Sequence, residues 1–125
     1  MQNIIAVFIG GGIGAVLRYL TGIFTLKYLA GLSFPVSTFI VNIAGCFILG
    51  ILFALFMDKP DINVSLKLAL TAGFCGGLTT FSTFSLEIFQ MLSGEHFLQG
   101  FIYIVISLIL GLTAVWLGVN CAKIF

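Results

Sequence analysis

Four long stretches without Asp, Glu, Lys or Arg limit the folds open to this chain more than any other feature. They cover residues 1–17, 28–57, 68–86 and 97–122. A helix of about 20 apolar residues spans a bilayer. Only 7% of the 125 residues are charged, against roughly 25% in an ordinary soluble domain. The sequence therefore predicts an all-α integral membrane protein, a single membrane domain over residues 1–125 with transmembrane helices at about 3–30, 35–57, 66–91 and 97–122.

The sparse charges also bear on partners and orientation. The formal net charge of +1 provides no basic patch of the kind that nucleic acid requires. With four spans both termini share one side of the bilayer with Lys59, Lys67 and Lys123, and Lys27 lies alone on the other side. Cytoplasmic loops normally carry a clear excess of Lys and Arg. This weak bias leans to termini inside but permits both orientations, and we expect a multi-pass protein of the cell (inner or plasma) membrane.

Catalytic groups are scarce, and their arrangement does not predict an enzyme. The sequence has one histidine, His96, in an expected loop, and no Ser/His/Asp set, carboxylate pair or metal-binding cluster. Among the acidic residues only Glu87 approaches a membrane segment; the full set is Asp58, Asp61, Glu87 and Glu95. The cysteines lie far apart in apolar runs, which favours small buried hydrophobic residues over disulfides or metal ligands: Cys46, Cys75 and Cys121.

One face of the first expected helix combines small residues with a charge. Ala6, Gly10 and Gly14 recur at a spacing of four, and Arg18 continues the series. Small residues at this spacing let helices approach closely in lipid, so they predict tight helix packing. A charge inside a membrane segment is costly and is usually paired or bonded to backbone carbonyls. Arg18 could serve substrate binding or architecture, and we favour architecture.

Polar residues form a stripe on the second and the fourth expected helices. Spacings of three or four residues align them on one face of each helix, at Thr38, Asn42 and Gly45 and at Tyr103, Ser107 and Gly111. Such residues often bond between packed membrane helices, so each stripe alone is compatible with a structural role. Because the third helix carries a stripe too, the sequence favours a polar track.

The third stripe lies in GFCGGLTTFSTFS, residues 73–85. Gly76 and Gly77 are poor helix formers, so we expect a break here, near the middle of the helix. In lipid a break is tolerated only where protein, water or an ion satisfies the freed backbone groups. Free carbonyls would favour a cation such as Na⁺ and free N–H groups an anion. If residues 79–90 are helical, hydroxyls and rings occupy two faces: Thr79, Ser82 and Thr83 on one, Phe81 and Phe84 on the other.

Three of these motifs together resemble one family, the Fluc or CrcB fluoride channels. They are GGGIGAVLRY at 10–19, FPVSTFIVNIAGCFILG at 34–50 and GFCGGLTTFSTFSLE at 73–87. The resemblance covers essentially the whole chain. It implies a passive, fluoride-selective channel that exports fluoride and lowers its cytoplasmic concentration. It further implies an antiparallel, dual-topology homodimer with two pores along the interface.

The resemblance also implies roles for individual residues. The fluoride path would be lined by Asn42, Phe81, Phe84, Ser82, Thr83, Thr38, Tyr103 and Ser107. The backbone carbonyls of Gly76 and Thr79 would hold a structural, untransported Na⁺, and Arg18 matches a structural arginine of the first helix. Gly111 departs from the pattern, because some members carry a serine there.

Two other functions remain open to a chain of this plan. A small proton-coupled exporter of the multidrug type also has four spans in a short chain, but it would need a carboxylate near the middle of the first span, where this sequence has Arg18. A non-transporting assembly protein would explain the glycine-rich faces but would leave the polar stripes without a role.

Overall fold

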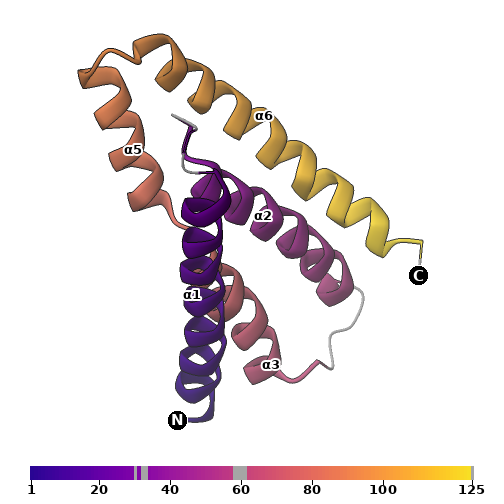
Figure 1. The fold of residues 1–125 in the computed structure, drawn as a ribbon. Coiled ribbons are helices and arrows are strands. Elements are labelled where there is room, and N and C mark those ends of the chain that lie inside the picture. Colours follow the sequence, from indigo (N-terminus) through magenta and orange to yellow (C-terminus); the bar gives the residue numbers. More distant parts are fainter. Residues whose placement is uncertain (30, 32–33, 58–61, 125) are drawn as a thin grey trace.

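The computed structural model describes residues 1–29, 31, 34–57 and 62–124, and its regular structure is helical (Figure 1). The elements are α1 (Gln2–Leu29), α2 (Val36–Met57), α3 (Val64–Leu68), the π-helix η1 (Ala69–Cys75), α4 (Gly76–Leu78), α5 (Phe81–Ser93) and α6 (Phe97–Ala122). Four helical segments are long and apolar enough to cross a membrane: Gln2–Leu29, Val36–Met57, Val64–Ser93 and Phe97–Ala122. The predicted all-α architecture with four spans is confirmed over the described residues.

Some of the sequence-based expectations concern residues outside the described ranges. They are residue 30, at the end of the first expected helix, and Asp58, Lys59 and Asp61, in the loop after the second.

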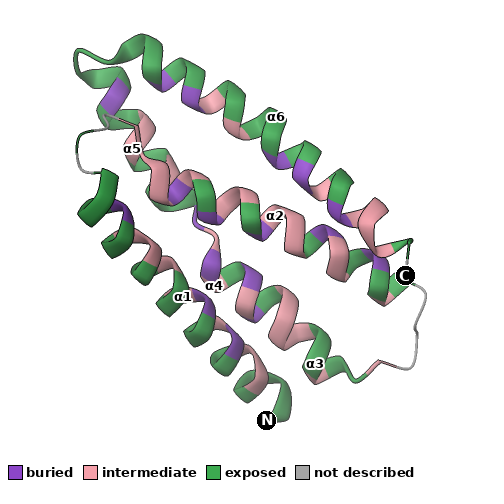
Figure 2. Ribbon diagram, turned by 45° about the vertical axis from the view of Figure 1, so that its right-hand side comes forward, coloured by how far each residue is buried: buried purple, intermediate pink, exposed green. Residues whose placement is uncertain are grey.

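The helices pack in pairs. α1 lies along η1 and α4, which form the first half of the third span, and α2 lies along α6. α5, the second half of the third span, packs mainly on α6 and only lightly on α2. Buried residues follow the faces that the helices turn to one another, whereas the outward faces are largely exposed (Figure 2). This is the distribution expected where lipid covers the outside of a bundle.

The glycine face of α1 allows the first pair to form. A Cβ added at Gly10 would overlap the carbonyl oxygen of Ala69, and one added at Gly14 would overlap that of Phe74. From the opposite side, a Cβ at Gly77 would overlap the carbonyl oxygen of Gly11. The backbones of α1 and the third span therefore touch, which confirms the tight packing predicted for the glycines of this face.

Glycines play the same part between α2 and α6. A Cβ at Gly50 would overlap the carbonyl oxygen of Val115, and one at Gly118 would overlap that of Phe47. The backbones of the two helices thus touch, and this contact holds α6 against α2.

The third span is interrupted at Thr79, which the sequence indicated, but not at the two glycines before it. Gly76 and Gly77 are helical within α4, and the chain becomes extended at Thr79 (φ −85°, ψ 156°) and Thr80 (φ −149°, ψ 115°). The prediction of a break near the middle is confirmed, and its placement at the glycines is wrong. The physical reason is that Gly77 packs against α1, while Thr80 caps α5 and so decides where the helix restarts. Thr79 accordingly does not share a helix face with Ser82 and Thr83.

We predict that Gly14→Ala lowers the free energy of unfolding by about 1–3 kcal/mol, because the added methyl group overpacks a backbone contact. Gly12→Ala is the matched control, since no atom lies within 4 Å of the Cβ that it adds. Thermal unfolding of the purified proteins in detergent measures the difference. Equal melting temperatures for the two variants would contradict the packing described for α1.

Candidate functional site

A groove of about 600 Å³ lies beside the break and is lined by residues of α2, the third span and α6. Its lining includes many of the residues predicted for the site: Asn42, Gly76, Thr79, Phe81, Phe84 and Ser107. The remaining predicted residues do not line it: Arg18, Thr38, Ser82, Thr83 and Tyr103. The structure thus gathers side chains from three spans at one place.

Arg18 reaches the break from α1. Its Nη1 donates a hydrogen bond to the carbonyl oxygen of Thr79 at 3.0 Å. A carbonyl oxygen has two lone pairs, so this contact leaves one of them free. The guanidinium therefore binds backbone that the interrupted helix leaves unpaired, and bonding to backbone carbonyls is common for a charge inside a membrane segment.

Asn42 reaches the break from α2 and pairs with the backbone of Thr80. The Thr80 N–H donates to Asn42 Oδ1 at 2.8 Å, and Asn42 Nδ2 donates to the Thr80 carbonyl at 3.3 Å. In an unbroken helix the Thr80 N–H would instead donate to the carbonyl of Gly76. The side-chain amide therefore replaces helical hydrogen bonds, and the Gly76 carbonyl loses its helical donor.

Thr80 is a site residue that sequence reasoning missed. Its Oγ1 accepts from the Thr83 N–H at 3.2 Å and donates to Thr83 Oγ1 at 3.0 Å, with Ser82 Oγ at 3.3 Å. Threonine is a favoured N-cap, and a threonine directly before a helical run is the signal that could have found it. Because Thr83 Oγ1 accepts the proton of the Thr80 hydroxyl, the Thr83 hydroxyl can donate its own proton away from Thr80.

The two phenylalanines present different amounts of surface. Phe81 is 81% exposed, whereas Phe84 is half-buried. Their ring centroids lie 6.3 Å apart at an interplanar angle of 40°, and Phe84 meets the Tyr103 ring edge-to-face at 4.9 Å. Phe84 is thus held by α6, while the ring of Phe81 has little of this chain against it.

Ser107 contributes a buried hydroxyl to the groove from α6. Its Oγ has no hydrogen-bond partner among the residues that the structure describes. A buried hydroxyl without a partner costs free energy, and nearly all such groups in folded proteins are satisfied. The groove therefore holds a donor that is suited to a ligand.

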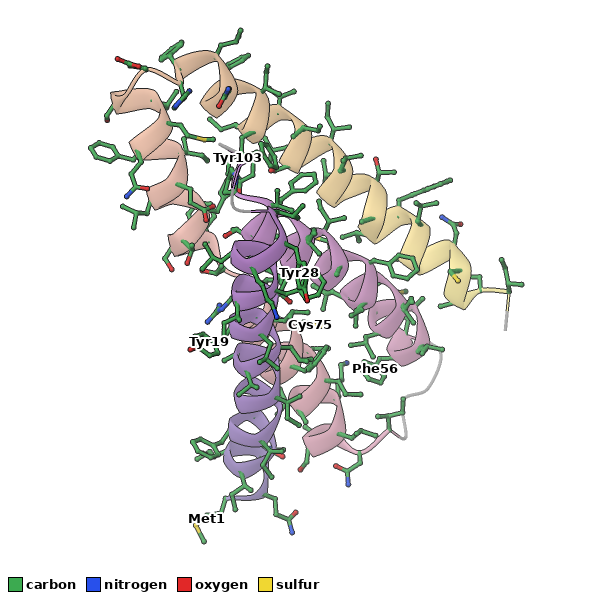
Figure 3. The ribbon with its side chains drawn as sticks, viewed as in Figure 1. Met1, Tyr19, Tyr28, Phe56, Cys75 and Tyr103 are labelled. Carbon is green, nitrogen blue, oxygen red and sulfur yellow. The ribbon has the colours of Figure 1, made fainter. Side chains whose placement is uncertain are left out.

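Thr38 and Tyr103 lie apart from the groove and contact Glu87, as Thr38 Oγ1 donates to one carboxylate oxygen at 2.6 Å and the Tyr103 hydroxyl to the other at 3.0 Å. Tyr103 is enclosed where α2, α5 and α6 meet (Figure 3). The sequence did not indicate these partners for Glu87, because the three residues are distant along the chain.

Comparison with known proteins gives one consistent family. Residues 5–119 match the family described as "CrcB-like protein, Camphor Resistance (CrcB)". A protein of Flavobacterium psychrophilum named "Fluoride-specific ion channel FluC" is 44% identical over 123 residues, which are 98% of this chain and 98% of that protein. A protein of the same name from Azobacteroides pseudotrichonymphae is 40% identical over 125 residues, 100% of this chain and 99% of its own. Another, from Phocaeicola vulgatus, is 43% identical over 119 residues, 95% and 97% of the two chains.

We predict that Thr80→Val destabilises the protein by about 1 kcal/mol, because it removes the N-cap of α5 while preserving the shape of the side chain. Thr80→Ser keeps the hydroxyl and serves as the control. Thermal unfolding in detergent compares the two variants with the wild type. If the valine variant melts with the wild type, the cap does not stabilise the restart of the helix.

Proposed function

The chain belongs to the CrcB-like protein family, and on this premise we propose that it is a passive, fluoride-selective channel that lets fluoride leave the cytoplasm. It is a multi-pass protein of the cell membrane, with four apolar helices that can span the bilayer. The relatives carry the name of an ion channel, not of an enzyme, and they do not favour the proton-coupled exporter.

The observation that carries the proposal is that uncharged donors and aromatic rings line one groove at the break. Fluoride is small and strongly hydrated, so a path must offer donors in place of water without holding the ion too tightly to leave. Hydroxyl and amide groups supply partial charges, and the edges of phenylalanine rings are electropositive. We assign the path to these groups: Asn42, Phe81, Phe84, Ser82, Thr83 and Ser107, with Thr38 and Tyr103 at the level of Glu87.

Arg18 has a structural role in this proposal. A free guanidinium on the path would bind fluoride strongly and slow its release. The hydrogen bond to the Thr79 carbonyl directs the charge of Arg18 at the backbone of the break. The arginine therefore supports the path without needing to bind the ion.

A second copy of the chain would complete the site. The exposed ring of Phe81, the open groove and the unpartnered Ser107 hydroxyl support an interface on this face, because lipid cannot satisfy polar groups. An antiparallel, dual-topology homodimer agrees with the small bias in positive charge. Among the described residues, Lys67 and Lys123 lie on the side of the termini and Lys27 lies on the opposite side. A two-fold axis would present the same groove from both copies.

A structural Na⁺ fits the backbone of the break. The Gly76 carbonyl has lost its helical donor to Asn42, and the Thr79 carbonyl keeps one lone pair beside Arg18. Gly76 is exposed, and a Cβ placed there would meet no atom within 4 Å. Unwound backbone carbonyls are suitable ligands for Na⁺ in membrane proteins. With the same two oxygens from a second copy, four carbonyls would surround the ion.

We predict that liposomes containing the protein release fluoride rapidly under a potassium gradient when valinomycin is added, and release chloride much more slowly. The donors fit a small hydrated anion, and the valinomycin carries the compensating charge. Ion-selective electrodes measure both fluxes. Chloride release at the same rate, or release that depends strictly on a proton gradient, would contradict the proposal.

Ring variants connect that flux to the groove. Phe81→Ile and Phe84→Ile should each reduce fluoride flux at least tenfold, because they remove electropositive ring edges. Phe89→Ile changes an exposed ring of the same helix outside the groove and should leave the flux unchanged. Equal flux in all three variants would exclude the rings from the path.

We further predict that replacing Na⁺ with N-methylglucamine throughout lowers fluoride flux and shifts the protein in detergent from dimer to monomer. A cation of this size cannot fit among backbone carbonyls. Light scattering during size-exclusion chromatography reports the mass, and liposome flux reports the activity. A protein that is monomeric in Na⁺ would contradict the dimer, whereas a dimer of full activity in N-methylglucamine would contradict only the ion site.

A further inference from the structure

Glu87 is the one acidic residue within a membrane span among the residues that the structure describes. It lies on α5 and is only partly exposed. A charged carboxylate at such a place is costly unless it is paired or hydrogen-bonded. The function proposed above does not use this residue.

Two buried hydroxyls satisfy the carboxylate. Thr38 from α2 is 5% exposed and Tyr103 from α6 is fully buried, and each donates to a separate oxygen of Glu87, at 2.6 and 3.0 Å. A hydroxyl has a single proton to donate. Both protons therefore point at Glu87, and neither is available to an anion on the path while this pairing lasts.

The hydroxyl–carboxylate cluster of Glu87, Thr38 and Tyr103 lies next to two cavities. On one side, Phe84 lines the groove at the break and meets the Tyr103 ring edge-to-face, with the ring centroids 4.9 Å apart. On the other side, Glu87 and Thr38 line a second cavity of about 350 Å³, which is also lined by α1 residues Gly22 and Thr25. The cluster therefore borders the second cavity directly and reaches the groove through the contact of Tyr103 with Phe84.

We propose that Glu87 is a tethered competitor of fluoride: its carboxylate holds the hydroxyl donors of Thr38 and Tyr103, and a passing fluoride must take them from it. Carboxylate oxygens and fluoride are both anionic acceptors, so the same donors serve either. The competition weakens fluoride binding at this level and helps the ion to leave, as conduction requires. Glu87 is thus a positioning residue that acts through the two hydroxyls, and the inference rests on the proposed function.

The test is the fluoride concentration that gives half-maximal flux in liposomes. Glu87→Gln removes the charge and holds the hydroxyls less strongly, so this concentration should fall. If the donors are free for roughly 10–30% of the time in the wild type, the fall is about threefold to tenfold, because apparent affinity scales with the competent fraction. Glu95→Gln makes the same chemical change in an exposed turn and should have no effect.

A second background separates competition from a purely structural role. In the double variant Thr38→Val with Tyr103→Phe, the donors are absent, so adding Glu87→Gln should not shift the half-maximal concentration further. A structural Glu87 would reduce flux equally at all concentrations and leave the half-maximal value unchanged. That result, or a shift that persists without the hydroxyls, overturns the inference while the fluoride flux of the wild type still supports the channel.

If Glu87→Gln does not fold, removing a single hydroxyl tests the same inference. Tyr103→Phe keeps the ring against Phe84 and removes one donor, so the half-maximal concentration should rise at least twofold. An unchanged value would show that fluoride does not use this hydroxyl and would overturn the inference. Absence of fluoride flux in the wild type would overturn the channel and the inference together.

Discussion

A helix interrupted inside a membrane must find partners for its free backbone groups, and this constraint organises the protein. Lipid offers no hydrogen bonds, so an open break would cost several kcal/mol for each unpaired group. Here Arg18 from α1 binds the Thr79 carbonyl and Asn42 from α2 pairs with both backbone groups of Thr80. The stability of the third span therefore depends on hydrogen bonds from the first two spans.

The glycines explain how these side chains reach the break. Gly14 lets α1 approach the backbone of the third span, and Arg18 follows it by one helical turn. Gly45 likewise lets α2 approach Thr79, and Asn42 precedes it by about one turn. A close helix contact one turn away thus positions each of these two polar residues at the break. Packing and polar chemistry are coupled, because a wider helix separation would leave the break without its partners.

Much of this arrangement could be predicted from local patterns. Long apolar runs identify the spans, and the spacing of Gly10 and Gly14 identifies a packing face, because both properties belong to single helices. The exact residue of the break and the partners of Glu87 could not be predicted in this way. They depend on contacts between spans, such as Gly77 against α1 and Thr38 against Glu87, which no local pattern contains. Thr80 lies between these cases, since its capping role is local but was obscured by the glycines before it.

Side chains from neighbouring helices satisfy the break, and the proposed fluoride path depends on this pairing. Residue-resolved hydrogen exchange at the Thr80 amide, measured with fluoride flux from the same proteoliposomes, tests this dependence. We expect slow exchange in the wild type, and fast exchange together with lost flux in Asn42→Ala. Fast exchange in the wild type, or a variant that exposes the Thr80 amide and still conducts normally, would contradict it.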